Sequence, residues 1–300
     1  MSKIGVVILT LNAERYMKPL LEALKKQSVP HKVLVADSHS KDNTVAIAES
    51  YGAEILMIPR KEFNHGLTRE KARKQLDADI VVFMTQDALP VDDTLIENLI
   101  APLVNNEAAL SYARQLPYPT AGFFEAFHRE YNYPETSQIR SIQDLGKFGA
   151  YTFFCSNSCA AYNSRELDAI GGFPDVLLGE DTYACATLLR NGKKIAYQSN
   201  AQVYHSHNYT LKEEFKRSFD TGYARSKLDT LIGGRSQDEK RGQAYAKTLL
   251  RRLFFKPWMY PYTFMLLTAK WLGYRLGHKG HRIPDKFKIK ISSTPYYFYK

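Results

Sequence analysis

Residues 4–12 read IGVVILTLN, and the fold class follows from the apolar run with which they begin. This run, Ile4–Leu9, has the length and the β-branched content of a fully buried strand. Three further runs of the same kind lie at Val33–Ala36, Ile55–Ile58 and Ile80–Met84. Because the first run begins almost at Met1, we expect no signal peptide. The sequence therefore predicts an α/β protein whose central strands are buried on both faces.

Helical patterns separate these runs. The apolar residues that share one helix face are Tyr16, Leu20, Leu21 and Leu24 in the first helix, and Val45, Ile47 and Ala48 in the second, which ends at Gly52. A third helix is predicted over Leu67–Leu76. Alternation of strand and helix at this spacing predicts right-handed crossovers and a parallel sheet. In such sheets, ligands bind at the carboxyl ends of the strands.

Polar residues follow the predicted strands. Thr10 and Asn12 follow the first strand, Asp37 the second and Asp87 the fourth, so we expect Asp37 and Asp87 to share one crevice. Neither of the glycine-rich phosphate loops follows the first strand, which disfavours dinucleotide oxidoreductases and P-loop NTPases. A nucleotide bound without such a loop needs another clamp for its diphosphate, usually a divalent cation on a carboxylate together with basic side chains.

Later in the chain the patterns predict four more elements. These are a strand over Phe153–Asn157, a helix over Arg165–Ile170, a helix that begins near Gly179 and a strand over Lys194–Tyr204. His205 and His207 follow this last strand, and two residues of separation place both side chains on one face of an extended chain.

Composition and charge limit the function classes. The chain has 300 residues, of which 44% are hydrophobic and 24% charged, so it buries a core and is neither disordered nor a coiled coil. Its three cysteines cannot all pair and lack metal-finger spacing, which indicates a reducing, cytoplasmic compartment. Residues 212–300 hold 20 Lys and Arg against 7 Asp and Glu, a net charge of +13, whereas residues 1–211 hold 21 against 24, a net charge of −3. The basic third indicates an anionic partner or a solvated tail.

These residues together resemble the inverting glycosyltransferases of family 2, which have the GT-A fold. The motifs that carry the resemblance are Val7–Asn12, Val35–Ser38, Asp42–Thr44 and the acidic turn at Asp87, with Gly171–Pro174 and Gly179–Asp181 on the acceptor side. Phe63–Gly66 followed by Arg69, and also Thr85–Ala88, resemble the rhamnosyltransferase branch. The ordered set covers about residues 3–225 and is far more specific than any single motif.

The resemblance implies a role for each candidate site residue. Nucleotide and donor binding falls to Thr10, Asn12, Asp37 (on the pyrimidine base), His65, Arg69, Gln86 and Asp87; Asp181 is the general base and Glu180 supports acceptor binding. Asp87 is also the ligand of Mg²⁺ or Mn²⁺, completed by His205 in preference to His207. The family usually presents Asp-x-Asp where this chain reads Gln86-Asp87-Ala88, so the cation is expected to bind weakly.

A purely structural explanation stays open for several of these residues. Asp37 can be a turn residue, as we expect Asp42 to be, and Asp87 can cap a helix that starts near Val91. Glu180 and Asp181 can be first-turn acids that the helix dipole favours. His65 can belong to a tight turn, and the two histidines at 205 and 207 can be surface residues.

The C-terminal third carries a different signal. Residues 249–276 are dense in aromatic and aliphatic side chains, interrupted by Lys256, Pro257, Pro261, Lys270 and Arg275. No run approaches the roughly 20 apolar residues that a spanning helix needs. Both tryptophans, Trp258 and Trp271, lie here near cations, which suits the headgroup layer of an anionic leaflet. The alternative is a helical subdomain packed on the catalytic core or on a second subunit in a homodimer.

We therefore expect a GT-A catalytic domain over residues 1–211, with nucleotide-sugar binding over 1–110 and acceptor binding over 111–211, and a helical extension over 212–300. The resemblance implies transfer of L-rhamnose from dTDP-L-rhamnose to a hydroxyl of a saccharide acceptor. The acceptor is expected on a polyprenyl diphosphate at the inner face of the plasma membrane, and no nucleic acid is expected to bind. The alternatives are a sugar nucleotidyltransferase, whose glycine- and basic-rich loop is missing after the first strand, and a nucleic-acid or lipid binding module.

Overall fold

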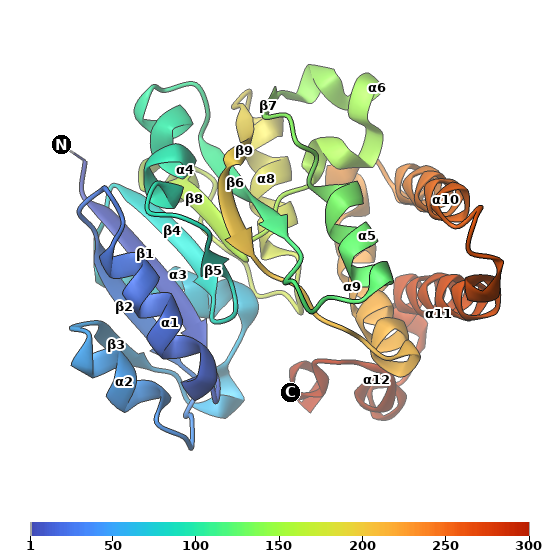
Figure 1. Cartoon of the computed structure of the whole chain (residues 1–300), viewed down its shortest axis with the longest axis horizontal. Helices are drawn as coiled ribbons and strands as arrows, with labels where there is room; N and C mark the ends of the chain where they lie inside the picture. Colours follow the sequence, from blue (N-terminus) through green and yellow to red (C-terminus); the bar gives the residue numbers. More distant parts are fainter. Residues whose placement is uncertain (1, 300) are drawn as a thin grey trace. The chain divides into compact units, whose positions relative to one another are not determined.

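The computed structural model describes residues 2–299, which form two compact units. The first unit comprises residues 2–145, 152–175 and 180–207, and the second comprises residues 146–151, 176–179 and 208–299. The first unit contains the whole sheet, whereas the second is helical (Figure 1).

The first unit contains nine strands and seven complete α-helices. The strands are β1 (Ile4–Thr10), β2 (Lys32–Asp37), β3 (Glu54–Met57), β4 (Ile80–Thr85), β5 (Leu89–Pro90), β6 (Leu110–Leu116), β7 (Gln138–Arg140), β8 (Cys159–Asn163) and β9 (Ile195–Tyr204). The helices are α1 (Glu14–Lys25), α2 (Thr44–Ser50), α3 (His65–Leu76), α4 (Leu95–Val104), α5 (Phe123–Asn132), α7 (Ser164–Ala169) and α8 (Glu180–Arg190).

The sheet runs in the order β3-β2-β1-β4-β8-β6-β9-β5, and β7 pairs with β9. The first four strands of the chain pair in parallel, as the sequence predicts. Thr10 lies opposite Asp37, and Leu9 lies opposite Thr85, so the ends of β1, β2 and β4 meet at one edge. Strand β8 joins β4 in antiparallel orientation and makes the sheet mixed.

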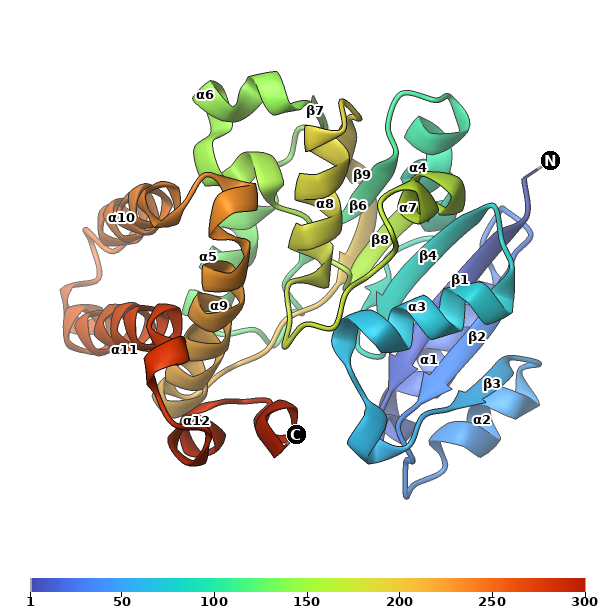
Figure 2. The same ribbon diagram turned by 180° about the vertical axis from the view of Figure 1, so that it is seen from behind.

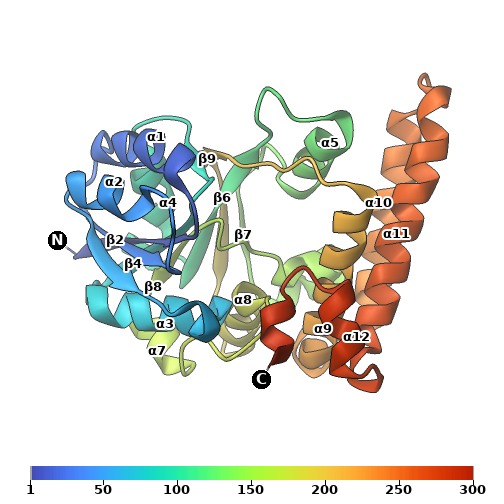
Figure 3. The same ribbon diagram turned by 90° about the horizontal axis from the view of Figure 1, so that it is seen from below.

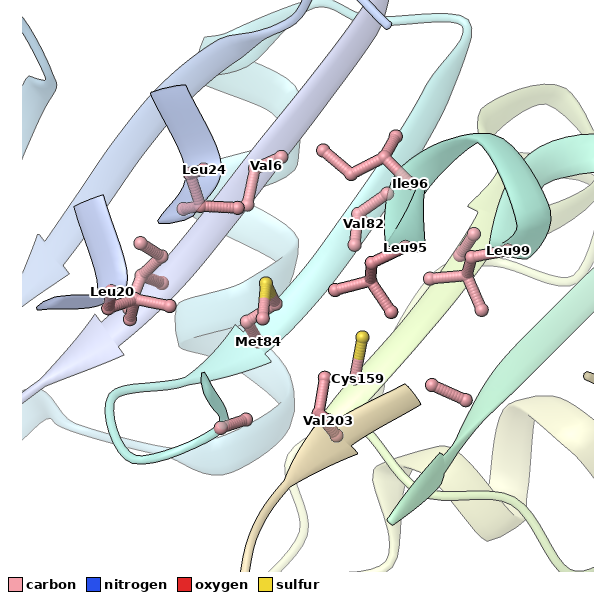
Figure 4. Packing of buried hydrophobic residues seen from close by; sticks show 14 of the residues in the cluster. Val6, Leu20, Leu24, Val82, Met84, Leu95, Ile96, Leu99, Cys159 and Val203 are labelled. Carbon is pink, nitrogen blue, oxygen red and sulfur yellow. The ribbon is translucent and has the colours of Figure 1, made fainter. Parts of the chain in front are cut away.

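Helices cover both faces of this sheet. Helices α1 and α4 lie on one face, and α3, α7 and α8 lie on the other (Figures 2 and 3). On the first face, Leu20 and Leu24 of α1 reach toward Val6 of β1 (Figure 4). On the same face, Leu95 and Ile96 of α4 lie near Val82 of β4. The leucines that the sequence places on one face of α1, namely Leu20, Leu21 and Leu24, are all buried in the structure.

One predicted strand is wrong. Residues 149–153 form a 3-10 helix, and the strand lies later, at β8 (Cys159–Asn163). The apolar pattern at Phe153 and Cys155 reflects burial without strand pairing, because Ser156 and Asn157 bind side chains elsewhere in the unit. The predicted helix over 165–170 and the predicted strand over 194–204 are confirmed as α7 and β9.

The second unit confirms the predicted helical extension. It contains α9 (Leu211–Ile232), α10 (Arg235–Arg252), α11 (Tyr260–His278), α12 (Asp285–Ile291) and most of α6 (Leu145–Phe148). Glycine lets α9 and α11 approach closely, since a Cβ on Gly277 would overlap the carbonyl oxygen of Phe219. Within residues 2–299, none of the helices combines the length and the apolarity needed to cross a bilayer.

Candidate active site

The end of β2 is organised around the carboxylate of Asp37. Its Oδ1 accepts hydrogen bonds from Thr10 Oγ1 (2.8 Å) and Ser40 Oγ (2.6 Å), and its Oδ2 accepts one from the Ser40 amide (2.7 Å). The side chain is fully buried. Asp37 therefore fixes the turn after β2, and a hydrogen bond from a nucleotide base would require this turn to move. The base-binding role stays a prediction.

Gln86 and Asn12, which were expected to bind the nucleotide sugar, also hold the loops at this edge together. Gln86 Oε1 accepts from the amide of Leu11 (2.8 Å), which ties the end of β4 to the loop after β1. Asn12 adopts a left-handed backbone conformation (φ +48°), and its Oδ1 accepts from the amide of Lys41 (2.9 Å). The structure thus brings Thr10, Asn12 and Gln86 together around the strand ends.

Asp87 lies beside two histidines at the same edge of the sheet. Strand β5 places them there, because Leu89 pairs with Tyr204 at the end of β9. Asp87 Oδ1 is 3.4 Å from His205 Nε2, and Asp87 Oδ2 is 3.0 Å from His207 Nε2. The two Nε2 atoms are 3.3 Å apart. The ligand atoms of all three side chains lie within 4.8 Å of one another.

The environment fixes the protonation of this cluster. Burial raises the pKa of Asp87, but the two adjacent histidines outweigh it and hold the pKa well below its usual range. Burial lowers the pKa of His205 in spite of Asp87, which favours a neutral ring. At neutral pH the carboxylate of Asp87 is therefore ionised and the imidazole of His205 is uncharged.

A buried chain of side chains assigns the tautomer of His205. Gln115 Oε1 accepts from Arg129 Nη1 (2.6 Å), and Gln115 Nε2 donates to Ser156 Oγ (2.9 Å). Because a guanidinium only donates, the oxygen of Gln115 must face Arg129. The same oxygen lies 2.9 Å from His205 Nδ1, so Nδ1 carries the proton and Nε2 carries a lone pair. Arg129 is itself held by Glu125 Oε1 at 2.8 Å.

This tautomer fits a bound divalent cation. The Nε2 lone pair of His205 and the oxygens of Asp87 are ligand atoms that lie close together, so one cation can contact both side chains. One carboxylate and two imidazoles suit Mn²⁺ better than Mg²⁺, because Mg²⁺ prefers oxygen ligands. The sequence favoured His205 over His207 as the second ligand. In the structure His207 lies at least as close to Asp87 as His205 does.

The second acidic pair begins α8, and its two carboxylates differ sharply. Glu180 is 4% exposed, and its Oε1 lies 3.0 Å from Arg69 Nη1 and 3.0 Å from Asn157 Nδ2. Burial disfavours its charge, but the positive charge of Arg69 outweighs burial and keeps the pKa of Glu180 below its ordinary value. Arg69 was expected to contact the nucleotide sugar. In the structure its guanidinium is instead paired with Glu180 inside the first unit.

Asp181 is partly exposed and titrates near neutral pH. Burial of the carboxyl group, followed by the charge of Glu180, raises the pKa of Asp181 to about 6. Its two oxygens accept from the amides of Thr182 (2.6 Å) and Asn157 (3.4 Å). A carboxylate with such a pKa is well placed to accept a proton at neutral pH.

Motifs that are distant in the sequence hold α3 in place beside this pair. Asn64 caps α3 and donates to Asp175 Oδ1 (2.8 Å), and Gly66 leaves room for the carbonyl oxygen of Pro174. Gly172 is left-handed (φ +75°), and a Cβ there would overlap the carboxylate of Glu70. The motif around His65 therefore positions the helix that carries Arg69, and the His65 ring packs edge-on against Phe63.

The loop at residues 156 and 157 joins the two clusters. Ser156 accepts from Gln115, which holds His205, and the next residue, Asn157, holds both Glu180 and Asp181. All of these residues belong to the first unit. Nothing in the sequence pattern singles out Gln115, Arg129 or Asn157, since a buried amide or cation carries no signal in the sequence until its partner is known.

Comparisons with known proteins identify the family of this chain. Residues 5–171 match the family model of glycosyl transferase family 2. The chain is 38% identical over 290 residues to the O-antigen chain rhamnosyltransferase RfbN of Salmonella typhimurium, covering 94% of this chain and 91% of the relative. It is 36% identical over 266 residues to the O-antigen chain rhamnosyltransferase WbaN of Salmonella anatum, covering 87% of this chain and 84% of the relative.

Solved structures share the architecture. The mannosyltransferase PcManGT from Pyrobaculum calidifontis, in complex with GDP-Man and Mn²⁺, superposes with a TM-score of 0.60 at 14% identity, covering 99% of this chain and 85% of that one. TarS 1–349 from S. aureus, in complex with UDP-GlcNAc, gives 0.57 at 17% identity, covering 93% and 91%. At these identities the likeness concerns the fold, and it confirms the expected GT-A architecture.

Proposed function

Since the chain belongs to glycosyl transferase family 2, we propose that this glycosyltransferase moves L-rhamnose from dTDP-L-rhamnose to a hydroxyl group of a growing polysaccharide, with inversion at the anomeric carbon. The two relatives that align along most of their length are O-antigen chain rhamnosyltransferases, which supports rhamnose as the sugar. The acceptor we propose is a lipid-linked saccharide at the cytoplasmic face of the membrane. Family membership favours this activity over a nucleotidyltransferase or a binding module.

Asp181 is the general base of this proposal. Its carboxylate takes the proton of the acceptor hydroxyl as the oxygen attacks the anomeric carbon. The new glycosidic bond forms as the bond to the diphosphate breaks, and the electron pair leaves with the nucleoside diphosphate. Glu180 stays ionised on Arg69 and raises the proton affinity of Asp181 through its negative charge. Arg69 acts through Glu180 and is a positioning residue.

Asp87, His205 and His207 are the residues that would hold Mg²⁺ or Mn²⁺, with Mn²⁺ favoured by the two imidazoles. When bound, such a cation neutralises the charge that develops on the departing diphosphate. Gln115 keeps the Nε2 lone pair of His205 directed toward this position. The nucleotide side of the proposed site lies at the ends of β1, β2 and β4 and is shaped by Thr10, Asn12, Asp37 and Gln86.

The observation that carries the proposal is that Ser156 and Asn157 connect two clusters that contain carboxylates. The cluster at Asp87 is suited to bind a cation, and the pair at Glu180 and Asp181 is suited to accept a proton. The test is a panel of nucleotide sugars incubated with the purified chain and Mn²⁺, with release of nucleoside diphosphate as the readout. We expect turnover with dTDP-L-rhamnose and little with UDP-GlcNAc or GDP-mannose. If dTDP-L-rhamnose is inert while another donor is hydrolysed, the assignment of the sugar is wrong.

A further inference from the structure

The second unit exposes a set of large apolar side chains. In the turn between α10 and α11, Phe254 is 71% exposed, Phe255 85% and Trp258 73%. On α11, Phe264 is 73% exposed and Trp271 59%. We call the turn at residues 253–259, together with the outward side of α11, the aromatic surface; Figure 1 shows the ribbon of both. Soluble proteins rarely expose this much aromatic area without a partner to cover it.

The two sides of α11 explain why these side chains are free to face outward. Thr263, Leu266, Gly273 and Gly277 are buried, and Gly273 and Gly277 lie against the backbone of α9. Phe264 and Trp271 are seven residues apart and share the other side, as do Met265 and Leu272. Packing of the unit is therefore complete without the aromatic side chains, and stability does not explain their presence.

The segment that carries the aromatic surface has charged residues of one sign only, and two of its cations, Lys270 and Arg275, are paired with Glu214 of α9 and Glu239 of α10. From Lys240 to Pro284 the sequence contains no Asp or Glu and has ten Lys and Arg, at positions 240, 241, 247, 251, 252, 256, 270, 275, 279 and 282. Arg251 and Arg252 are exposed directly before the turn, and Lys256 is exposed within it. The Arg275 guanidinium lies over the Trp271 ring, 5.4 Å from its centroid. The surface therefore suits a partner that is both apolar and anionic.

These features discriminate between two occupants. In a symmetric dimer the same surface would meet itself and bring basic side chains together, which is unfavourable. An anionic leaflet offers hydrocarbon for the rings and phosphate groups for the cations. We propose that the aromatic surface docks on the anionic phospholipid of a membrane, with the rings of Phe254, Phe255 and Trp258 in the interfacial layer.

The inference deepens the proposed function, on which it rests for the lipid-linked acceptor, but its test needs neither donor nor acceptor. The only two tryptophans of the chain, Trp258 and Trp271, both lie in the aromatic surface, so intrinsic fluorescence reports on it directly. The full chain is titrated with phosphatidylcholine vesicles, with and without phosphatidylglycerol, and with brominated lipids that quench tryptophan at known depth. We expect a blue shift and quenching with the anionic vesicles, both reduced by added salt.

Matched variants identify the side chains responsible. Phe254→Ser with Phe255→Ser removes two exposed rings and is expected to weaken vesicle affinity by about 100-fold. Arg251→Glu with Arg252→Glu is expected to abolish the preference for anionic vesicles. The controls are Val104→Ser with Ile139→Ser, two exposed apolar residues of the first unit, and Lys25→Glu with Lys26→Glu at the C-terminal end of α1. The controls are expected to bind as the parent chain does.

Three results would overturn the inference. One is equal binding to neutral and anionic vesicles, and another is equal loss of binding in the control variants. The third is an absence of vesicle binding combined with a concentration-dependent dimer in analytical ultracentrifugation that the Phe254 and Phe255 variant abolishes, which assigns the surface to a second copy. Donor hydrolysis by the same protein without vesicles tests the proposed function separately. Vesicle binding can therefore fail while the glycosyltransferase assignment holds, and the reverse is equally measurable.

Discussion

Replacing Asp181 by Asn tests the proposed base directly. The substitution keeps the size of the side chain and an oxygen that can accept from the Thr182 amide, but it removes the site for the proton. A positioned general base contributes about 10²–10⁴-fold to a rate, so we expect sugar transfer to fall by that factor. Donor affinity should change little, because Asp87, His205 and His207 are untouched.

The pH dependence gives the same test a second readout. Because the base acts in its ionised form and the pKa of Asp181 is raised to about 6, kcat/KM should rise with pH through about 6. With that pKa the carboxylate is about 9% ionised at pH 5 and about 91% ionised at pH 7, which predicts roughly a tenfold change in kcat/KM. The pKa of Glu180 lies below its usual value, so Glu180 is ionised across this range and adds no change. The Asn variant should lack the acid limb.

The assay follows release of nucleoside diphosphate and formation of the glycoside by chromatography, at saturating Mn²⁺ and from pH 5 to pH 8. Asp93→Asn is the matched control, because Asp93 is an exposed carboxylate of the same unit. Donor binding by calorimetry and an unchanged melting temperature show that the Asp181 variant is folded. Full turnover by that variant would refute the role of Asp181.

Three further substitutions test the contacts that support the fold and the site. Arg69→Met leaves the buried carboxylate of Glu180 without its cation and should lower the free energy of unfolding by about 3–5 kcal/mol in chemical denaturation, so a loss under about 1 kcal/mol would contradict the buried pair. Gln115→Leu removes the acceptor that orients His205 and should weaken Mn²⁺ binding, followed by electron paramagnetic resonance, by about 10–100-fold; unchanged affinity would exclude this role. Gly277→Ala should force α9 and α11 apart and cost about 1–3 kcal/mol, seen as a lower melting temperature, whereas equal stability would argue against the close helix contact.

Much of the first unit follows from local sequence pattern. The run Ile4–Leu9 and its three counterparts predict buried parallel strands, and the structure pairs β1, β2, β3 and β4 in parallel. Burial is wrong for β3, because it lies at the edge of the sheet with Glu54 and Met57 exposed. The pattern is reliable for the other three because a strand buried on both faces must be apolar at nearly every position. The same reasoning fails at Phe153–Asn157, where apolar residues are buried in a 3-10 turn and a loop, and hydrophobicity alone does not distinguish that loop from a strand.

Local pattern is also enough to place four acidic residues at strand and helix ends, namely Asp37, Asp87, Glu180 and Asp181. The partners of each carboxylate became visible only in the folded chain. Asp37 is enclosed by Thr10 and Ser40, whereas Asp87 lies open to two histidines that are 118 and 120 residues further along the chain, at His205 and His207. The physical reason is that secondary structure depends on neighbours within a few residues, while the charge and the partners of a side chain depend on groups that folding brings from anywhere in the chain.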